Sequence, residues 1–301
     1  MQADVHSSAL FQNIYKEIIK MKSRILTGVI GSVIVTAWLL LMYTPVFSIV
    51  IAVLSVIAAY EMLKAFSVKN PIFKALCFLI AAAIPFYAEY KAKLNLPLFP
   101  IVTAVVIISL IISVLDFKKL SFEQVACSLA SCALIPSALS CIVLFRDLYV
   151  TYEGAYTKVD GIFFIIFIFV ASWGSDTFAF FAGKFFGKHK LAPVISPKKT
   201  VEGAIGGTLC STLVNVGLYF LFNHFFTLSN NTSFILVLIA SPVLSVISIF
   251  GDLAASTIKR HHGIKDFGNL LPGHGGIMDR FDSTCFVLPV LYSIITVINA
   301  I

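Results

Sequence analysis

The most informative shortage in this 301-residue sequence is charge. Asp, Glu, Lys and Arg make up only 12% of the residues, against about 25% in ordinary soluble domains. Five stretches contain none of these four residue types: 25–60, 94–115, 124–145, 203–251 and 283–301. A membrane-spanning helix needs about 20 apolar residues, so the first and fourth stretches are each long enough for two. The composition therefore excludes a soluble globular protein and predicts an all-α, polytopic membrane protein.

Three further absences narrow the function. The six cysteines include no C-x-x-C pair and lie in or beside apolar segments, which favours buried thiols over disulfides or a zinc site. Residues 1–24 are polar and of mixed charge, so they do not read as a cleavable signal peptide. There is no G-x-x-x-x-G-K-[ST] motif, which argues against a P-loop ATPase.

The apolar windows predict about nine membrane-spanning helices in one integrated membrane domain. Residues 1–24 are expected to form a cytoplasmic amphipathic segment, residues 25–160 spans one to five, and residues 161–301 spans six to nine with the catalytic region. The predicted spans are 25–43, 45–63, 72–90, 98–115, 124–145, 161–182, 203–223, 233–255 and 281–300.

The distribution of basic residues predicts the sidedness of these spans. With the N-terminus placed inside, eighteen of the 22 Lys and Arg residues fall in inner segments and four fall outside. Such asymmetry favours a cytoplasmic N-terminus and an outer C-terminus. Both charged loops of the C-terminal half, 183–202 and 256–280, would then face the cytoplasm.

Four acidic residues of the C-terminal half lie at or inside predicted spans: Asp176, Asp252, Asp279 and Asp282. Carboxylates at that depth are costly unless they are paired or bound to metal. Helical spacing places Asp252 and Ser256 on one face, and Asp279 with Asp282 on another. Two such faces meeting would form a site for Mg²⁺, which takes carboxylates, water and substrate phosphates. The alternative is that these carboxylates only neutralise neighbouring Lys and Arg side chains.

Basic residues and glycines accompany these carboxylates. Lys198 and Lys199 lie in one charged loop, and Lys259, Arg260, Lys265 and Arg280 surround the segment "LPGHGG" in the other. Glycines that lead into a helix let backbone N–H groups approach an anion. The combination suits a polyphosphate bound with a divalent cation. Two acidic residues are interpreted differently: Glu202 as a residue that orients a lysine, and Glu61 as structural.

The segment "STIKRHHGIKDFGNLLPGHGGIMDRFDS" (256–283) resembles the signature of the phosphatidate cytidylyltransferases, also called CDP-diglyceride synthetases. That pattern reads S-x-x-K-R-x₄-K-D-x-G-x₂-L-P-G-H-G-G-x-x-D-R-x-D, and every element is present. "SPKKTVEG" (196–203), "GSDTFAFFAGK" (174–184) and "GDLAAS" (251–256) also resemble elements of this family. The resemblance covers residues 172–283, while the N-terminal half matches only as generic membrane helices.

The resemblance implies transfer of CMP from CTP to phosphatidate, giving CDP-diacylglycerol and pyrophosphate. Mg²⁺ is the implied cofactor, with room for a second cation. The expected partners are CTP, phosphatidate from the inner leaflet and the bilayer, but no nucleic acid; a homodimer is left open. The expected location is the plasma or inner membrane, with the active site facing the cytoplasm.

The residues that would carry this reaction fall into three groups. The expected metal ligands are Asp176, Asp252, Asp279 and Asp282. The expected catalytic residues are Lys199, Lys259, Arg260, His274, Asp279 and Arg280. The expected substrate-binding residues are Ser196, Lys198, Lys199, Thr200, Glu202, Ser256, Lys259, Arg260, Lys265, Gly275 and Gly276.

Two other functions compete with this interpretation. A CTP-dependent polyprenol or phytol kinase shares related membrane architecture, but its alcohol acceptor should need a general base, and the full motif disfavours it. An ion-coupled transporter could use Asp176 and Asp252 as a relay. A transporter, however, would place charges near the midplane between repeats, and no convincing repeat is found here.

Overall fold

The protein is helical throughout most of the chain in a computed structural model that describes residues 36, 38–91, 94, 96–270 and 275–300. Seven helical segments of this part are long and apolar enough to cross a membrane. They are α2 (Pro45–Ala65), α3 (Pro71–Tyr90), α4 (Leu98–Leu115), α5 (Phe122–Arg146), a continuous segment Lys158–Phe186, α9 (Val201–Phe225) and α10 (Phe234–His261). Shorter helices are α6 (Leu148–Thr151), α11 (Met278–Phe281) and the 17-residue apolar α12 (Thr284–Ala300). The chain is a polytopic, multi-pass α-helical membrane protein.

Most predicted spans coincide with helices of the structure. Each of the eight predicted spans from 45–63 onward has a helix at its place. Of the predicted span 25–43, only residues 36 and 38–43 are described, and the predicted amphipathic segment 1–24 lies wholly outside the described residues. The prediction for the last span began too early: residues 278–281 form the separate turn α11, and α12 begins at Thr284.

The long segment Lys158–Phe186 is interrupted by a turn of π-helix. It consists of α7 (Lys158–Phe169), the π-helical turn η1 (Val170–Gly174) and α8 (Ser175–Phe186). Turns of this kind often mark functional sites. Here the turn comes directly before Asp176 in the first turn of α8.

Side-chain caps fix where several helices begin. Asn70 accepts a hydrogen bond from Phe73 N at the start of α3, and Ser121 forms a capping box with Gln124 at the start of α5. Thr200 caps α9 by accepting a hydrogen bond from Gly203 N. Such caps satisfy N–H groups that the helix itself leaves free. The Thr200 cap begins α9 immediately after the lysine pair.

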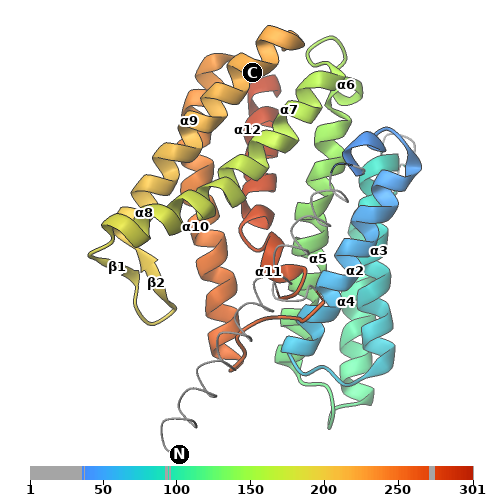
Figure 1. The fold of residues 1–301 in the computed structure, drawn as a ribbon. Helices are drawn as coiled ribbons and strands as arrows, with labels where there is room; N and C mark the ends of the chain where they lie inside the picture. Colours follow the sequence, from blue (N-terminus) through green and yellow to red (C-terminus); the bar gives the residue numbers. More distant parts are fainter. Residues whose placement is uncertain (1–35, 37, 92–93, 95, 271–274, 301) are drawn as a thin grey trace, which may run out of the picture.

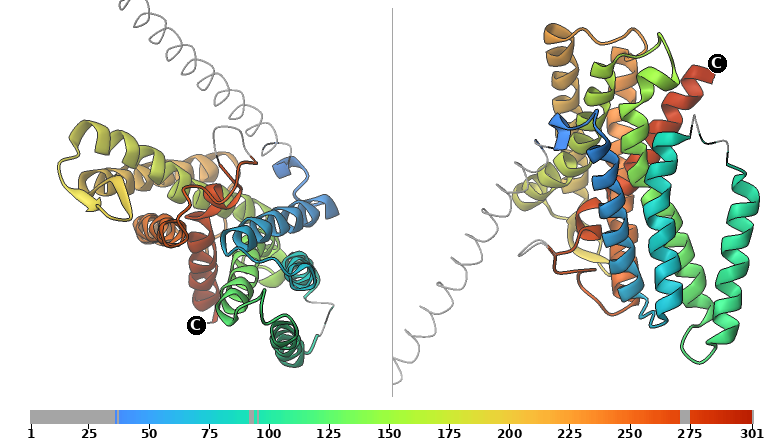
Figure 2. Two further views of the ribbon diagram at one scale, coloured as in Figure 1. Left: turned by 90° about the horizontal axis from the view of Figure 1, so that it is seen from below. Right: turned by 90° about the vertical axis from the view of Figure 1, so that its right-hand side faces the viewer.

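The helices form two groups joined through α12 (Figure 1). Helices α2, α3 and α5 pack against one another, and α8, α9 and α10 form the second group. Helix α12 contacts both α10 and α5. Helix α4 stands at the edge of the first group, and Ser109 is its only buried residue (Figure 2). Short α11 lies between α10 and α2 (Figure 1).

The charged loop 183–202 forms a small β-hairpin, which the all-α prediction did not include. Strands β1 (Lys190–Ala192) and β2 (Ser196–Thr200) pair antiparallel, with Lys190 opposite Thr200. This hairpin and the connections α2–α3, α4–α5 and α10–α11 lie in the lower half of Figure 1. The charged loops that the sequence placed on one membrane face are therefore at the same end of the bundle.

Candidate functional site

A cavity of about 640 Å³ lies where α8, β2, α9, α10 and α11 meet. Its volume is within the usual range for small-molecule sites. Five carboxylates and six cationic side chains line it. They are Asp176, Asp252, Asp266, Asp279 and Asp282, with Lys184, Lys190, Lys198, Lys199, Lys259 and Arg280. In so apolar a protein, this concentration of positive and negative side chains makes the cavity the candidate functional site. We call it the charged cavity.

Lys199 is shared by two carboxylates from different helices. Its Nζ lies 2.5 Å from Asp252 Oδ2 and 3.9 Å from Asp176 Oδ1. Asp252 comes from α10 and Asp176 from α8, while Lys199 is near the end of β2. Ser256, one turn after Asp252, donates to Asp252 Oδ1 at 3.4 Å. The two carboxylates thus already flank one positive charge.

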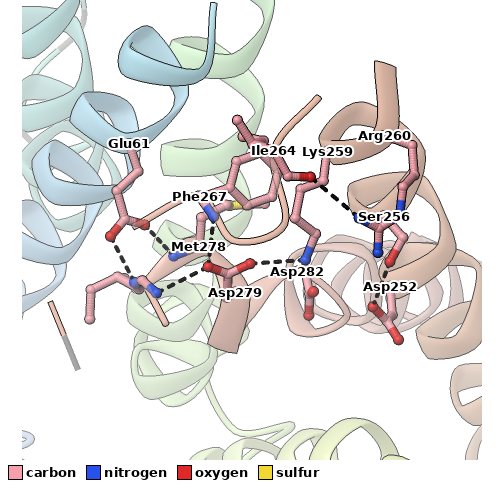
Figure 3. Close-up of polar contacts among 12 residues, drawn as sticks. Glu61, Asp252, Ser256, Lys259, Arg260, Ile264, Phe267, Met278, Asp279 and Asp282 are labelled. Carbon is pink, nitrogen blue, oxygen red and sulfur yellow. Dashed lines mark hydrogen bonds and ion pairs between the residues drawn. The ribbon is translucent and has the colours of Figure 1, made fainter. Parts of the chain in front are cut away.

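Asp279 is buried and almost fully hydrogen-bonded (Figure 3). Its Oδ2 accepts hydrogen bonds from Phe267 N at 2.8 Å and Gly276 N at 3.0 Å. Its Oδ1 accepts a hydrogen bond from Lys259 Nζ at 2.9 Å. Asp279 therefore fastens the two described parts of the α10–α11 loop together and holds Lys259 at the wall of the charged cavity.

Asp282 differs from Asp176, Asp252 and Asp279 in having no ion pair with a described residue. It is buried, and its Oδ1 accepts a hydrogen bond from Ser283 N at 2.8 Å. It forms no ion pair with any residue that the structure describes. Of the four predicted metal ligands, Asp282 is thus the one whose charge no described Lys or Arg side chain pairs with.

The carboxylates suit Mg²⁺ only together with substrate oxygens. In the described part of the chain, no three Asp, Glu, His or Cys side chains are grouped closely enough to hold an ion on their own. Mg²⁺ usually binds through one or two carboxylates plus water and phosphate oxygens. Asp176 and Asp252, which share a single cation, and Asp282, which lacks one, fit that requirement.

Glycines bring α8 against α9 and so bring Asp176 towards Lys199. A Cβ at Gly207 would lie 2.6 Å from Ser175 O, and one at Gly203 would lie 2.7 Å from Ala179 O. Only glycine allows backbones to approach this closely, as in membrane helix pairs with small residues at the interface. The turn η1 is also tied to the site, because Trp173 Nε1 donates to Arg280 O at 2.8 Å.

The structure brings ten of the predicted site residues to the wall of the charged cavity. They are Asp176, Ser196, Lys198, Lys199, Thr200, Asp252, Lys259, Asp279, Arg280 and Asp282. Gly275 and Gly276 lie beside Asp279, and a Cβ at Gly275, whose φ is +84°, would be 3.0 Å from Asp279 Oδ2. His274 lies outside the described residues.

Four other predicted residues do not line the cavity. Ser256 binds Asp252, as described above, and Lys265 is exposed. Arg260 donates to the carbonyl oxygens of Ile195 and Ile264, both at 3.4 Å. Glu202 accepts hydrogen bonds from Lys188 N at 3.0 Å and His189 N at 3.2 Å, and lies 2.6 Å from His189 Nδ1. Glu202 thereby holds residues 188 and 189, which lead into strand β1, against the start of α9.

The sequence assigned no catalytic or binding role to three residues that the structure connects to the site. Asp266 lines the charged cavity, and its position in the motif was the available signal. Trp173 binds the backbone of Arg280, for which the sequence offered no signal. Glu61 was interpreted as structural, yet its carboxylate accepts hydrogen bonds from the backbone at the start of α11.

Comparison with known proteins identifies the family. Residues 22–298 match the cytidylyltransferase family. The chain belongs to this family. Among its relatives are the phosphatidate cytidylyltransferases of Staphylococcus haemolyticus, Staphylococcus saprophyticus and Staphylococcus epidermidis, which are 47%, 49% and 50% identical to this chain over 135 residues. Each match covers 45% of this chain, and the chain spans 50% of the length of each of these relatives.

Proposed function

We propose that this protein transfers CMP from CTP to phosphatidate, forming CDP-diacylglycerol and pyrophosphate. The observation that carries the proposal is the charged cavity, in which carboxylates and cations meet within a membrane protein. Membership of the cytidylyltransferase family and the names of the relatives support the same reaction. The resemblance of residues 256–283 to the phosphatidate cytidylyltransferase motif points to phosphatidate as the acceptor.

The chemistry calls for cations more than for a base. A phosphatidate oxygen is already anionic near neutral pH and would attack the α-phosphorus of CTP. An oxygen–phosphorus bond forms there while the bond to the β-phosphate oxygen breaks, and pyrophosphate leaves with its electrons. The main obstacle is the repulsion between two polyanions and the charge that develops on the leaving group. Positioning and electrostatic stabilisation dominate catalysis in reactions of this class.

The basic side chains divide this work according to their positions. Lys198, Lys199, Lys259 and Arg280 line the charged cavity and would contact the phosphates of the two substrates. Arg260 and Lys265 would act from its rim, with His274 from the adjoining glycine-rich loop. The binding surface around these basic side chains would be shaped by six smaller or polar residues: Ser196, Thr200, Glu202, Ser256, Gly275 and Gly276.

Mg²⁺ fits the carboxylates of the charged cavity. Asp176, Asp252 and Asp282 would hold it, with Asp279 as a further ligand, and a second cation could share the set. When bound, Mg²⁺ would neutralise phosphate oxygens and stabilise the charge that develops on pyrophosphate. Lys199, which contacts both Asp176 and Asp252, would contact the phosphates of the nucleotide from the same wall of the cavity.

The membrane arrangement belongs to the same proposal. Nine spans with a cytoplasmic N-terminus and an outer C-terminus would open the charged cavity to cytoplasmic CTP. Acyl chains of phosphatidate would stay in the inner leaflet of the plasma or inner membrane while the headgroup enters sideways. A homodimer is compatible with this arrangement.

The test uses the full-length protein reconstituted in lipid with phosphatidate, CTP and Mg²⁺. We expect CDP-diacylglycerol and pyrophosphate in equal amounts, identified by mass spectrometry and by a pyrophosphate assay. Diacylglycerol in place of phosphatidate is the control acceptor and should give no product, because it lacks the attacking phosphate. Failure of phosphatidate to react in folded protein would contradict the proposal.

A further inference from the structure

Glu61 of α2 reaches across the molecule to the start of α11 (Figure 3). Its Oε1 accepts a hydrogen bond from Ile277 N at 3.0 Å, and its Oε2 accepts one from Met278 N at 2.8 Å. The residue is only 2% exposed. No ion pair with a described residue accompanies it. Backbone N–H groups therefore bind this buried carboxylate at both oxygens.

The neighbouring N–H group along the chain is bound by the site itself. Gly276 N donates to Asp279 Oδ2, so three consecutive amides, 276 to 278, are divided between Asp279 and Glu61. Asp279 in turn holds Lys259 Nζ at 2.9 Å, and both side chains line the charged cavity. The position of Glu61 is thus linked to Lys259 through one short stretch of backbone.

Two glycines of the α10–α11 loop make room for Glu61. A Cβ at Gly268 or at Gly276 would collide with Glu61 Oε1. Both described parts of the loop, one with Gly268 and one with Gly276, therefore pack closely against this carboxylate. If position 61 served packing alone, an apolar side chain would do so without the free-energy cost of burying a charge.

We propose that Glu61 is a positioning residue for the transferase reaction. By fixing the amides of Ile277 and Met278, it sets the orientation of Asp279 and hence the place of Lys259 in the charged cavity. This inference rests on the proposed function. It gives a residue of the N-terminal half of the chain an influence on the reaction in the charged cavity.

The first test is Glu61→Gln in the full-length protein in lipid, with Glu123→Gln as the matched control. Glu123 is exposed in the first turn of α5, so the control removes one carboxylate away from the site. Glutamine keeps one acceptor but turns an N–H₂ group towards an amide donor. We expect kcat to fall tenfold or more, with less than a threefold change in the KM for CTP and a near-normal thermal midpoint. The control should retain wild-type values.

Hydrogen exchange provides a readout that does not depend on the reaction. In Glu61→Gln, the peptide covering residues 275–281 should exchange faster, because two amides lose their common anionic acceptor. Unchanged exchange together with an unchanged kcat would overturn the positioning role. Absence of CDP-diacylglycerol with the wild-type protein would instead count against the proposed reaction, and exchange alone would then decide the role of Glu61.

Gly276→Ala tests the same contact with Glu61 left in place, and so covers the case in which Glu61→Gln does not fold. Gly276→Ala adds a methyl group against Glu61 Oε1 and should lower kcat in the wild-type background. In a Glu61→Ala background the same change should cost much less, because the opposing atom is gone. Such coupling is expected of residues in contact. Equal costs in both backgrounds would contradict the proposal.

Discussion

At the scale of single residues, the carboxylates of the charged cavity differ in what already binds them. Asp279 accepts two backbone hydrogen bonds and one from Lys259, whereas Asp282 accepts one from the adjacent amide. An aspartate with three donors organises the chain around it. An aspartate with a single donor can turn its charge towards a ligand.

This difference predicts different outcomes for two matched substitutions. Asp282→Asn should abolish most activity while the thermal midpoint stays within a few degrees of wild type. Asp279→Asn should also lower the free energy of unfolding by about 1–3 kcal/mol, since a buried donor loses its acceptor. Activity assays and thermal unfolding of both proteins in the same lipid would check this. Equal thermal midpoints for the two variants would contradict the distinction.

The two basic residues Lys199 and Arg260 should also differ. Lys199 lies between Asp176 and Asp252, while Arg260 is bonded to carbonyl oxygens at the rim. We expect Lys199→Ala to lower kcat and kcat/KM together by tenfold or more, about 1.4 kcal/mol per factor of ten. Arg260→Ala should have the smaller effect on kcat. Steady-state kinetics would check this ranking, and a rise in KM alone for Lys199→Ala would make that residue a uniform binder.

At the scale of helices and loops, the sequence predicted where most helices lie along the chain, but not which side chains contact one another. Apolar runs located α2, α3, α4 and α5 within a few residues, because a bilayer requires long, internally hydrogen-bonded apolar segments. The charged motifs likewise identified most of the cavity wall. The contact between Glu61 and α11 joins residues 216 and 217 positions apart and leaves no periodic signal. The turn η1 and the β-hairpin were also not predicted, because both depend on local packing and leave no periodic pattern in the sequence.

The α8–α9 contact offers a test at this scale. Gly207→Ala should separate the helices, because its Cβ would lie 2.6 Å from Ser175 O, and overpacking of this kind costs about 1–3 kcal/mol. Gly217→Ala in the same helix meets no atom within 4 Å. It should be neutral or stabilising by up to about 1 kcal/mol, since alanine favours helix over glycine. Thermal unfolding of the two variants would show the difference, and equal destabilisation would contradict the close-packing account.

At the scale of the whole molecule, the connections that carry most of the Lys and Arg residues lie in the same half of the bundle (Figure 1). In the proposed orientation, this half faces the cytoplasm. In a background without native cysteines, Lys198→Cys and Lys265→Cys should be protected from a membrane-impermeant thiol reagent in intact cells. Lys158→Cys should react. Labelling of position 198 from outside would reverse the proposed orientation.

The reaction itself is tested most directly by following the two ends of the triphosphate. Purified wild-type protein would be given phosphatidate and Mg²⁺ with CTP labelled at either the α- or the γ-phosphate. The proposed transfer of CMP predicts that the α label enters the lipid fraction while the γ label is released as pyrophosphate. Entry of the γ label into lipid would show a CTP-dependent kinase and contradict the proposed function.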